Sequence, residues 1–436
     1  MPKVTIVVDL GFGDAGKGLL TDHLVRRMGA RTVVRFNGGA QAGHNVVAPE
    51  GLHHCFSQLG AGMLVPGVRT FLSHEVVVDP LALRVEAQVL ARTAGGDPLA
   101  QLAVDAAARI ITPYHRAANR LFERARGKGA HGSCGVGFGQ TVQDSLEWPE
   151  DTLRAGELSD RATLRRKLGR VRARKRAELA PLLTGDLGPE AALEREVFED
   201  DALAERWMDQ VADIAHGLLL GDAPLLRRWL LEGPAVFEGA QGVLLDEQHG
   251  FAPHTTWSTC TFEPALGLIE ACTADAEVER VGVLRSHAVR HGAGPLPTET
   301  SALKGVVREH NQPHPFQGSV RYGWFDAVLA RYALAVIGGV DRLAITHLDL
   351  ADRAALFAAP AYEGGSGWLV PDRLRPLTAQ EEMTRALFAS RPVLEPLPSS
   401  REGVLEAIEA LLGSPVALAS GGPRSSDVQE RTARTA

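Results

Sequence analysis

Short apolar runs alternate with stretches of helical periodicity along this chain. Six runs are rich in β-branched and other apolar residues: Val4–Val8, Thr32–Phe36, Ala235–Glu238, Val281–Leu284, Arg342–His347 and Val416–Ala419. Helical stretches such as Leu203–Leu220 lie between them. Strands that are continuously apolar and are separated by helices are typical of a parallel sheet covered on both faces. The pattern predicts an α/β fold with a mostly parallel central β-sheet flanked by helices.

The chain has 436 residues, which exceeds an average domain, yet large single α/β domains reach this size. It contains no internal repeat and no low-complexity linker, so we expect one domain over residues 1–436. Residues 361–376 are rich in glycine and proline and are expected to form a loop. The polar segment 424–436 is expected to be loosely held.

Charge and apolar content exclude several classes of protein. The formal net charge is −7, whereas general nucleic-acid binders carry a basic excess. A local basic run over residues 165–176 is interpreted as the solvated face of a helix rather than a polyanion site. The four cysteines lack CxxC spacing, which argues against a zinc site and a disulfide framework. Because no signal segment and no apolar stretch of ~18 residues is found, we expect a cytoplasmic protein without membrane contact.

A glycine-rich segment, Gly11–Gly18, follows the first predicted strand and precedes a helix. Its four glycines allow the backbone to approach an anion, and the helix presents free N–H groups. The spacing is not that of a Walker loop, so a phosphate loop and a plain glycine-rich turn are both open. Lys17 would neutralise a phosphate. Asp14 would repel one unless it holds Mg²⁺ or takes a proton, so its place in the loop predicts a chemical role.

A second glycine-rich segment, Arg35–His44, follows the second predicted strand. It places His44 after backbone that can approach a ligand. Histidine at such a position suits acid catalysis or contact with a phosphate. A purely structural role is commoner for a single loop histidine, and both interpretations stand on these residues alone.

Seven ordered segments carry a resemblance to a known family. The first two, FGDAGKGL at 12–19 and VRFNGGAQAGH at 34–44, are similar to the patterns WGDEGKGK and VRxxGGxNAGH. The others are FEGAQG with LD and HG at 237–250, GAGPLPTE at 292–299, GWFD at 323–326, THLD at 346–349 and SGGP at 420–423. In this order and over nearly the whole chain, the segments resemble the adenylosuccinate synthetase family.

The resemblance implies a C–N ligase of purine nucleotide biosynthesis. Family members transfer the γ-phosphoryl group of GTP to O6 of IMP, and the amino group of aspartate then displaces the phosphate. Asp14 matches the base that removes the N1 proton and also ligates Mg²⁺, and the Gly43 carbonyl matches a second Mg²⁺ contact. His44 matches the acid that stabilises the moving phosphoryl group. The resemblance also implies a homodimer with the active site near the interface.

Other site residues are implied position by position. The implied catalytic residues are Asp14, Lys17, His44 and Gln241, the last through contact with IMP. The implied nucleotide-binding residues are Gly13, Ala15, Gly16, Gly18, Gly43, His347, Asp349, Ser420, Gly421 and Gly422. The implied substrate-binding residues are Asn37, Gln41, Ser133, Cys134, Thr256 and Arg321. Asp349 would read guanine by accepting hydrogen bonds from N1 and N2, although ATP stays open as the donor. Without the family, helix caps and turns would be the preferred interpretation of such residues.

Departures from the family concentrate where IMP phosphate and aspartate should bind. Gly318 and Val320 stand where two ligand arginines are expected, and only Arg321 remains. Trp148 stands where an arginine should reach across the dimer interface to the IMP phosphate. Further changes are Cys134 for a hydroxyl, Gln41 for an asparagine and His347 for a lysine. His310, His314 and Gln317 are partial substitutes in or near the segment Phe316–Trp324, which matches the family's aspartate-binding loop and is called the aspartate loop below.

Three hypotheses follow from this pattern. The first is an adenylosuccinate synthetase with a reorganised aspartate loop. The second is a paralogous ligase that applies the same phosphoryl activation to another oxo-acceptor or another amine. The third is a catalytically silent nucleotide-binding protein. Asp14 and His44 disfavour the third hypothesis, because a protein that only binds nucleotide needs neither.

Overall fold

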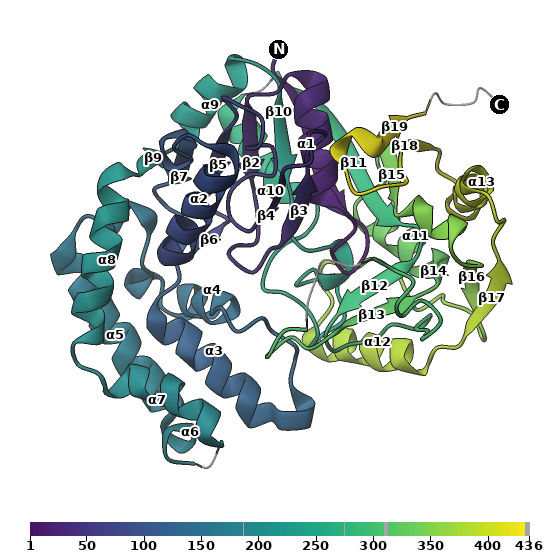
Figure 1. Cartoon of the computed structure of the whole chain (residues 1–436). Helices are drawn as coiled ribbons and strands as arrows, with labels where there is room; N and C mark the ends of the chain where they lie inside the picture. The colour runs from purple at the N-terminus through teal and green to yellow at the C-terminus, as the bar shows by residue number, and fades with distance from the viewer. Residues whose placement is uncertain (186, 274, 309–312, 432–436) are drawn as a thin grey trace.

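A ten-stranded sheet forms the centre of the protein (Figure 1). The structure is a computed structural model, which describes residues 1–185, 187–273, 275–308 and 313–431. Its strand order is β19-β18-β15-β11-β1-β10-β2-β5-β7-β9. The strands are β1 (Lys3–Asp9), β2 (Thr32–Arg35), β5 (Arg69–Leu72), β7 (Leu102–Asp105), β9 (Leu219–Gly221), β10 (Ala235–Glu238), β11 (Glu277–Arg285), β15 (Arg342–Thr346), β18 (Val416–Ser420) and β19 (Val428–Glu430). Within this sheet only the β18–β19 pair is antiparallel. All six predicted strands belong to the sheet, which confirms the predicted fold class.

Helices cover the sheet, and further short strands form small sheets separate from it. The helices are α1 (Lys17–Met28), α2 (Pro80–Ala94), α3 (Pro113–Arg126), α4 (Phe138–Glu147), α5 (Arg161–Glu178), α6 (Ala180–Thr184), α7 (Ala192–Glu199), α8 (Leu203–Gly217), α9 (Ala223–Leu231), α10 (Glu263–Cys272), α11 (Ala327–Val336), α12 (Leu377–Ala389) and α13 (Arg401–Leu412). The short strands are β3 (His44–Val47), β4 (His53–Phe56), β6 (Val77–Val78), β8 (Arg109–Ile110), β12 (Ala288–His291), β13 (Val320–Gly323), β14 (Phe325–Asp326), β16 (Phe357–Tyr362) and β17 (Pro392–Pro396). Helices α3 to α8 gather at one end of the molecule (Figure 1).

Both faces of the central sheet are buried. Along β1, Ile6 and Val8 pack into one apolar cluster, while Val7 between them packs into another on the opposite face. A strand buried on both faces gains from apolar side chains at every position. This burial explains why the central strands appear in the sequence as uninterrupted apolar runs.

The strand order reverses direction at β1. From β1 the chain passes through α1 to β2 and then outward to β5, β7 and β9. It returns to β10 on one side of β1, continues to β11 on the other side, and builds β15 and β18 outward from there. Loops that leave the carboxyl ends of strands at such a reversal form a crevice, the usual ligand position in open α/β sheets.

Some sequence-based boundaries differ from the structure. The predicted helix over 203–220 ends at Gly217, and its last residues enter β9. The expected loop over 361–376 begins two residues later, at Glu363, because β16 extends to Tyr362. The expectation of a loose segment from 424 onward is wrong for Val428–Glu430, which pair with β18 at the edge of the sheet. Residues 432–436 lie outside the described part of the chain.

The basic run forms the helix α5, as expected, but only part of it faces solvent. Arg165 pairs with Glu205 at the surface. Lys175 is fully buried and forms ion pairs with Asp144 at 2.5 Å and with Glu178 at 2.8 Å. The solvated-face interpretation therefore fits Arg165 and not Lys175. Separately, no helix in the described residues has the length and apolar character needed to cross a membrane.

Candidate active site

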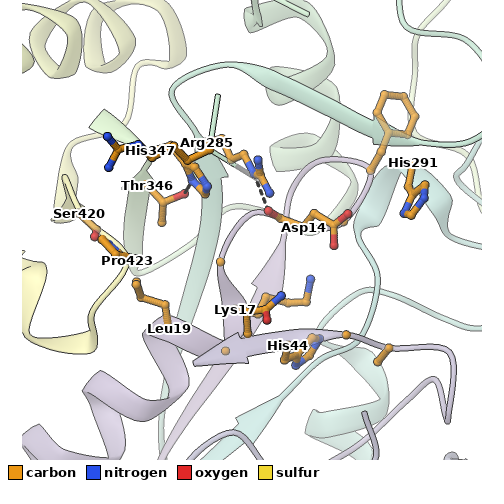
Figure 2. A pocket seen from close by; sticks show the side chains of 18 of the residues that line it. Asp14, Lys17, Leu19, His44, Arg285, His291, Thr346, His347, Ser420 and Pro423 are labelled. Carbon is orange, nitrogen blue, oxygen red and sulfur yellow. Dashed lines mark hydrogen bonds between the residues drawn. The ribbon is translucent and has the colours of Figure 1, made fainter. Parts of the chain in front are cut away.

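A cavity of about 490 Å³ opens at the carboxyl ends of the central strands (Figure 2). Loops that follow β1, β10, β15 and β18 contribute to it, together with β3 and the last residue of β11. The lining residues predicted from the sequence are Gly13, Asp14, Gly16, Lys17, Gly18, Gln41, Gly43, His44, Gln241, His347, Asp349, Ser420 and Gly422. Segments far apart in the sequence therefore meet at the crevice that the reversed strand order creates.

The Asp9 side chain holds the glycine-rich loop through hydrogen bonds. Its carboxylate accepts hydrogen bonds from the N–H groups of Gly11 and Ala15, both at 2.8 Å. It also accepts one from Nζ of Lys17 at 3.0 Å, and both side chains of this ion pair are buried. A carboxylate with three such donors fixes the loop conformation. Sequence reasoning missed Asp9, which appears in the sequence only as the last residue of an apolar strand.

Asp14 adopts a left-handed backbone conformation with φ of 60°. This region is uncommon for residues other than glycine, so a surrounding contact must hold it. Nε of Arg285 donates a hydrogen bond to the Asp14 carbonyl oxygen at 2.5 Å, and the Asp14 carboxylate extends into the cavity (Figure 2). Arg285 also lines the cavity and was not predicted, because 271 residues separate it from Asp14.

His44 is oriented by a buried carboxylate. Its Nδ1 lies 2.6 Å from Oε1 of Glu238, and the other Glu238 oxygen accepts the N–H of Ala61 at 2.9 Å. Burial is the largest cause that lowers the pKa of His44, to about 4, while the charge of Glu238 opposes the shift. Despite its burial, the pKa of Glu238 is lowered by the charges of His44 and Arg35. At neutral pH, a neutral His44 donates Nδ1–H to Glu238, and Nε2 is left for a ligand.

Gln241 and Thr256, two of the residues implied by the resemblance, contact each other in the structure. Nε2 of Gln241 donates to Oγ1 of Thr256 at 2.9 Å, and Gln241 has φ of 59°. Thr256 does not line the cavity, so it acts in this structure on Gln241. Gln41 lines the cavity, and both polar atoms of its side chain are buried with no hydrogen-bond partner among the residues that the structure describes. Gln41 therefore has an amide available for a ligand.

Asn37 binds the protein backbone rather than the cavity. Its side chain accepts from the N–H of Ala240 at 2.7 Å and donates to the carbonyl oxygens of Ala240 and Thr259. It thereby fixes the loop that presents Gln241. The predicted contact between Asn37 and a substrate stays a prediction.

At the other end of the cavity, two loops form a site suited to a nucleotide base. Oγ1 of Thr346 donates to the carbonyl of Ala15 at 2.8 Å, which joins this end to the phosphate loop. His347 is left-handed with φ of 59°, and Asp349 forms an ion pair with Arg353. Oγ of Ser420 donates to the Gly422 carbonyl at 2.9 Å. Two predicted nucleotide-binding residues do not line the cavity: Ala15, in the phosphate loop, and Gly421, in the loop after β18.

Besides Asn37 and Thr256, the predicted substrate residues Ser133, Cys134 and Arg321 also lie outside the cavity lining. Ser133 accepts a hydrogen bond from Nδ2 of Asn119 at 2.8 Å, and burial raises the pKa of Cys134 to about 11. Arg321 pairs with Glu299 and donates to two carbonyl oxygens, those of Gly292 and Gly294. In this structure, the surviving arginine of the aspartate loop is thus committed to protein groups.

Two of the residues that replace expected arginines, Gly318 and Trp148, contact other parts of the protein. The backbones of Gly318 and His314 form a mutual pair of hydrogen bonds at 2.8 Å. Trp148 is exposed and lies beneath the guanidinium of Arg174 at 5.3 Å. The polar groups that line the cavity near this loop are His291, Arg308 and Gln317, of which the sequence analysis named only Gln317. His310 lies outside the described residues.

The residues that would hold Mg²⁺ fit that ion chemically. The Asp14 side chain and Gly43 both line the cavity and supply oxygen donors, a carboxylate and a backbone carbonyl. Mg²⁺ prefers oxygen and is commonly bound through one or two carboxylates together with substrate phosphates. No group of three or more His, Cys, Asp or Glu side chains suited to a metal occurs among the residues that the structure describes. Asp14 and Gly43 thus fit the kind of site that substrate phosphates complete.

Comparisons with known proteins show which sequences the chain resembles over nearly its whole length. The sequence model of the adenylosuccinate synthetase family matches residues 6–429. Adenylosuccinate synthetase from Thermobifida fusca is 30% identical, with 97% of each chain covered, and that from Mycobacterium leprae is 34% identical, with 94% of this chain and 89% of the other covered.

Solved structures share the fold. Fully ligated adenylosuccinate synthetase from Plasmodium falciparum superposes with a TM-score of 0.76 at 20% identity, with 99% of this chain and 100% of the other covered. Cyanophage S-2L succinoaminodeoxyadenylate synthetase, bound to dGMP and to dATP as an energy donor, gives 0.60 at 20% identity, with 99% and 95% covered.

Proposed function

The chain belongs to the adenylosuccinate synthetase family of C–N ligases, and on that premise we propose the reaction of its cavity. The protein phosphorylates the 6-oxo group of IMP, or of an IMP-like acceptor, with GTP, and then displaces the phosphate with the amino group of aspartate. One observation carries the proposal: Asp14 and Gln241, from two separate loops, and His44, from the start of β3, line one cavity. A carboxylate, an imidazole and an amide beside a glycine-rich loop suit phosphoryl transfer with proton removal.

In the first step, O6 of the acceptor bonds to the γ-phosphorus of GTP while the bond between this phosphorus and the β,γ-bridging oxygen breaks, and GDP leaves. Asp14 takes the N1 proton, which increases the negative charge on O6 and makes it the nucleophile. Backbone N–H groups of the loop and Lys17 hold the donor phosphates. The approaching phosphoryl oxygens favour protonation of His44, whose Nε2 then donates a hydrogen bond to them. Each proton-transfer residue contributes roughly 10²- to 10⁴-fold in rate.

In the second step, the amine nitrogen bonds to C6 while the bond between C6 and O6 breaks. The phosphate leaves with the O6 oxygen, and the amine loses one proton. Phosphorylation thus converts a poor leaving group into a good one. Gln241, held by Thr256 at 2.9 Å, orients the purine during both steps.

Members of this family use GTP and Mg²⁺. We propose that Asp14 and the Gly43 carbonyl hold the ion here, beside the donor phosphates. When bound, Mg²⁺ neutralises charge on the transferring phosphoryl group. Asp14 therefore has two roles that one carboxylate fulfils with its two oxygens.

A second candidate is a paralogous ligase with a different oxo-acceptor or a different amine. This candidate is supported by the absence or engagement of the arginines that the family uses to bind the substrates. Gly318 and Val320 have no cationic side chain, and Arg321 is engaged by Glu299. The ligase chemistry is the same in this candidate, while the group that anchors the acceptor phosphate or the amine carboxylate differs.

We also propose a cytoplasmic homodimer, on the basis of the family. Trp148 stands where the family places an arginine that reaches the partner's active site, so the dimer of this chain would lack that contact. Light scattering of the purified protein measures the oligomeric state. A monomer at micromolar concentration would overturn this part of the proposal.

The test of the function is a substrate panel with the purified protein, GTP and Mg²⁺. With IMP and aspartate we expect an absorbance change from a succinylated adenine and the release of one phosphate per product. Absence of product with IMP and aspartate, together with GTP turnover on another oxo-acceptor or amine, would exclude the first candidate and support the second. No turnover on any member of the panel contradicts both.

A further inference from the structure

The base end of the cavity contains an arginine that the sequence analysis did not consider. Arg353 and Asp349 both line the cavity, and the Arg353 guanidinium forms an ion pair with Oδ2 of Asp349. Nη1 of Arg353 also donates to the carbonyl of Val306 at 3.1 Å. The guanidinium is therefore held at two points beside the carboxylate to which the proposed function assigns recognition of guanine.

Local backbone geometry brings the two side chains together. His347 adopts a left-handed conformation and starts the short helical turn Leu348–Asp352. Asp349 lies within this 3₁₀ turn and Arg353 follows directly after its end, so the two side chains are close enough to form the ion pair. The same turn points both side chains toward the cavity. The ion pair therefore depends on the conformation of the loop that lines the base end of the cavity.

Recognition of guanine by a carboxylate needs acceptors for two donors, N1–H and N2–H. Arg353 already occupies one oxygen of Asp349, so guanine must share this oxygen or displace the guanidinium. Adenine presents an acceptor at N1, which an unpaired carboxylate repels. A guanidinium can donate to that acceptor and also cancels the carboxylate charge. The pair therefore weakens the feature that favours guanine and supplies one that suits adenine.

We propose that Arg353 is a specificity-determining residue, which lowers the preference of the donor site for GTP and admits ATP as well. This inference rests on the proposed function, since it concerns the base of the phosphoryl donor. The ion pair between Arg353 and Asp349 differs from ordinary surface ion pairs because both of its residues line the cavity. Arg280 and Asp341 form a comparable ion pair of similar partial exposure, but neither lines the cavity.

Calorimetric titration with GDP and with ADP tests the inference without any need for turnover. For the wild-type protein we expect dissociation constants of the two nucleotides within about tenfold of each other. Arg353→Ala removes the competitor and should shift the GDP-to-ADP affinity ratio toward GDP by about three- to tenfold, the range that corresponds to a partly exposed ion pair and a lost donor. Arg353→Gln keeps a polar side chain, although a shorter one, removes the charge, and should give the same direction of change.

Arg280→Ala serves as the matched control and should leave the ratio unchanged. An unchanged ratio in both Arg353 variants, with circular dichroism showing that both are folded, would overturn the inference. So would a shift toward ADP. If the wild-type protein binds neither nucleotide, the proposed function itself fails, and this outcome differs from a failure of the inference alone.

Discussion

Three residues other than glycine have positive φ in the described part of the chain, and all three line the cavity. They are Asp14, Gln241 and His347, with φ between 59° and 60°. Such conformations cost about 1–3 kcal/mol each unless contacts favour them, and they cluster at functional sites. Here the contacts are visible, including Arg285 on the Asp14 carbonyl and Thr256 on the Gln241 side chain. The backbone is strained where side chains must point into the cavity.

Replacement of Asp14 tests its role as the base. Asp14→Ala removes the acceptor of the N1 proton, so we expect turnover to fall by roughly 10²- to 10⁴-fold. Binding of GDP should remain measurable, because the loop N–H groups and Lys17 are unchanged. Steady-state assays and calorimetry measure the two effects. The exposed Asp213 gives a control, and Asp213→Asn should retain full turnover. Wild-type turnover in Asp14→Ala would refute the proposed mechanism.

The pKa of His44 predicts a specific dependence on pH. In the free protein His44 should titrate near pH 4, because burial lowers its pKa from 6.5 to about 4. The folded-state pKa lies below that of the unfolded chain, so His44 costs stability as pH falls from 6.5 toward 4. The Glu238 charge raises the pKa of His44, so Glu238→Gln should lower the titration midpoint further. Histidine NMR titration measures both midpoints. A midpoint near 6.5 in the free wild-type protein contradicts the burial argument.

At the scale of elements, the approach of α1 to β3 sets the distance between the phosphate loop and His44. Gly18 lies in the first turn of α1, where an added Cβ would stand 2.9 Å from Cβ of His44 and 3.1 Å from the Asn45 carbonyl oxygen. Real Cβ atoms do not approach another heavy atom so closely without movement. A glycine here therefore permits the helix to pack on the strand that carries the catalytic histidine.

Paired glycine substitutions test this packing. Gly18→Ala should displace β3 or α1, with a loss of about 1–3 kcal/mol in the free energy of unfolding and a loss of activity. Gly169, within α5, has nothing within 4 Å of an added Cβ. Gly169→Ala should instead stabilise the protein by about 0.5–1 kcal/mol through helix propensity. Denaturant unfolding measures both variants. Equal effects of the two substitutions would argue against the close approach at Gly18.

The buried charges that join α4 and α5 give a second prediction at this scale. Lys175 is fully buried against Asp144. Although burial opposes its charge, hydrogen bonds and charges from His115 and Lys175 hold the pKa of Asp144 well below its usual range. Asp144→Ala would leave Lys175 with only Glu178, so we expect a loss of about 3–5 kcal/mol in unfolding free energy.

The control for this pair is Asp201, whose side chain is 93% exposed in its ion pair with Arg172. Asp201→Ala should change the unfolding free energy by less than about 1 kcal/mol. Chemical denaturation at neutral pH compares the two variants. A loss at Asp144 no larger than the loss at Asp201 would show that the buried pair is not a major contribution to stability.

At the scale of the whole molecule, the sequence predicts the fold well and the site only in part. The central strands are predictable because burial on both faces requires continuous apolar runs. Asp14 and His44 are predictable because each belongs to a glycine-rich segment with a recognisable pattern. By contrast, Glu238 lies 194 residues from His44, and Arg285 lies 271 residues from Asp14. Their spacing gives no local signal, since only the order of strands in the sheet brings them together.

The sheet also explains how the residues that bind the substrates can change while the phosphoryl-transfer residues are kept. The phosphate loop and Gln241 follow adjacent central strands, β1 and β10, whose positions are fixed by burial. The aspartate-loop positions Gly318 and Val320 instead lie at the start of β13 or in the turn before it, within a two-stranded sheet outside the central one. Substitutions there leave the central core untouched. A change of acceptor or amine is therefore compatible with an intact phosphoryl-transfer site.

The central claim is that O6 of the acceptor is phosphorylated before the amine displaces it. The most direct measurement uses IMP labelled with ¹⁸O at O6, together with GTP, Mg²⁺ and aspartate, and follows the released phosphate by ³¹P NMR. The predicted result is one ¹⁸O atom in each phosphate released, because the O6 oxygen leaves on phosphorus. Formation of the C–N product with unlabelled phosphate would contradict the claim.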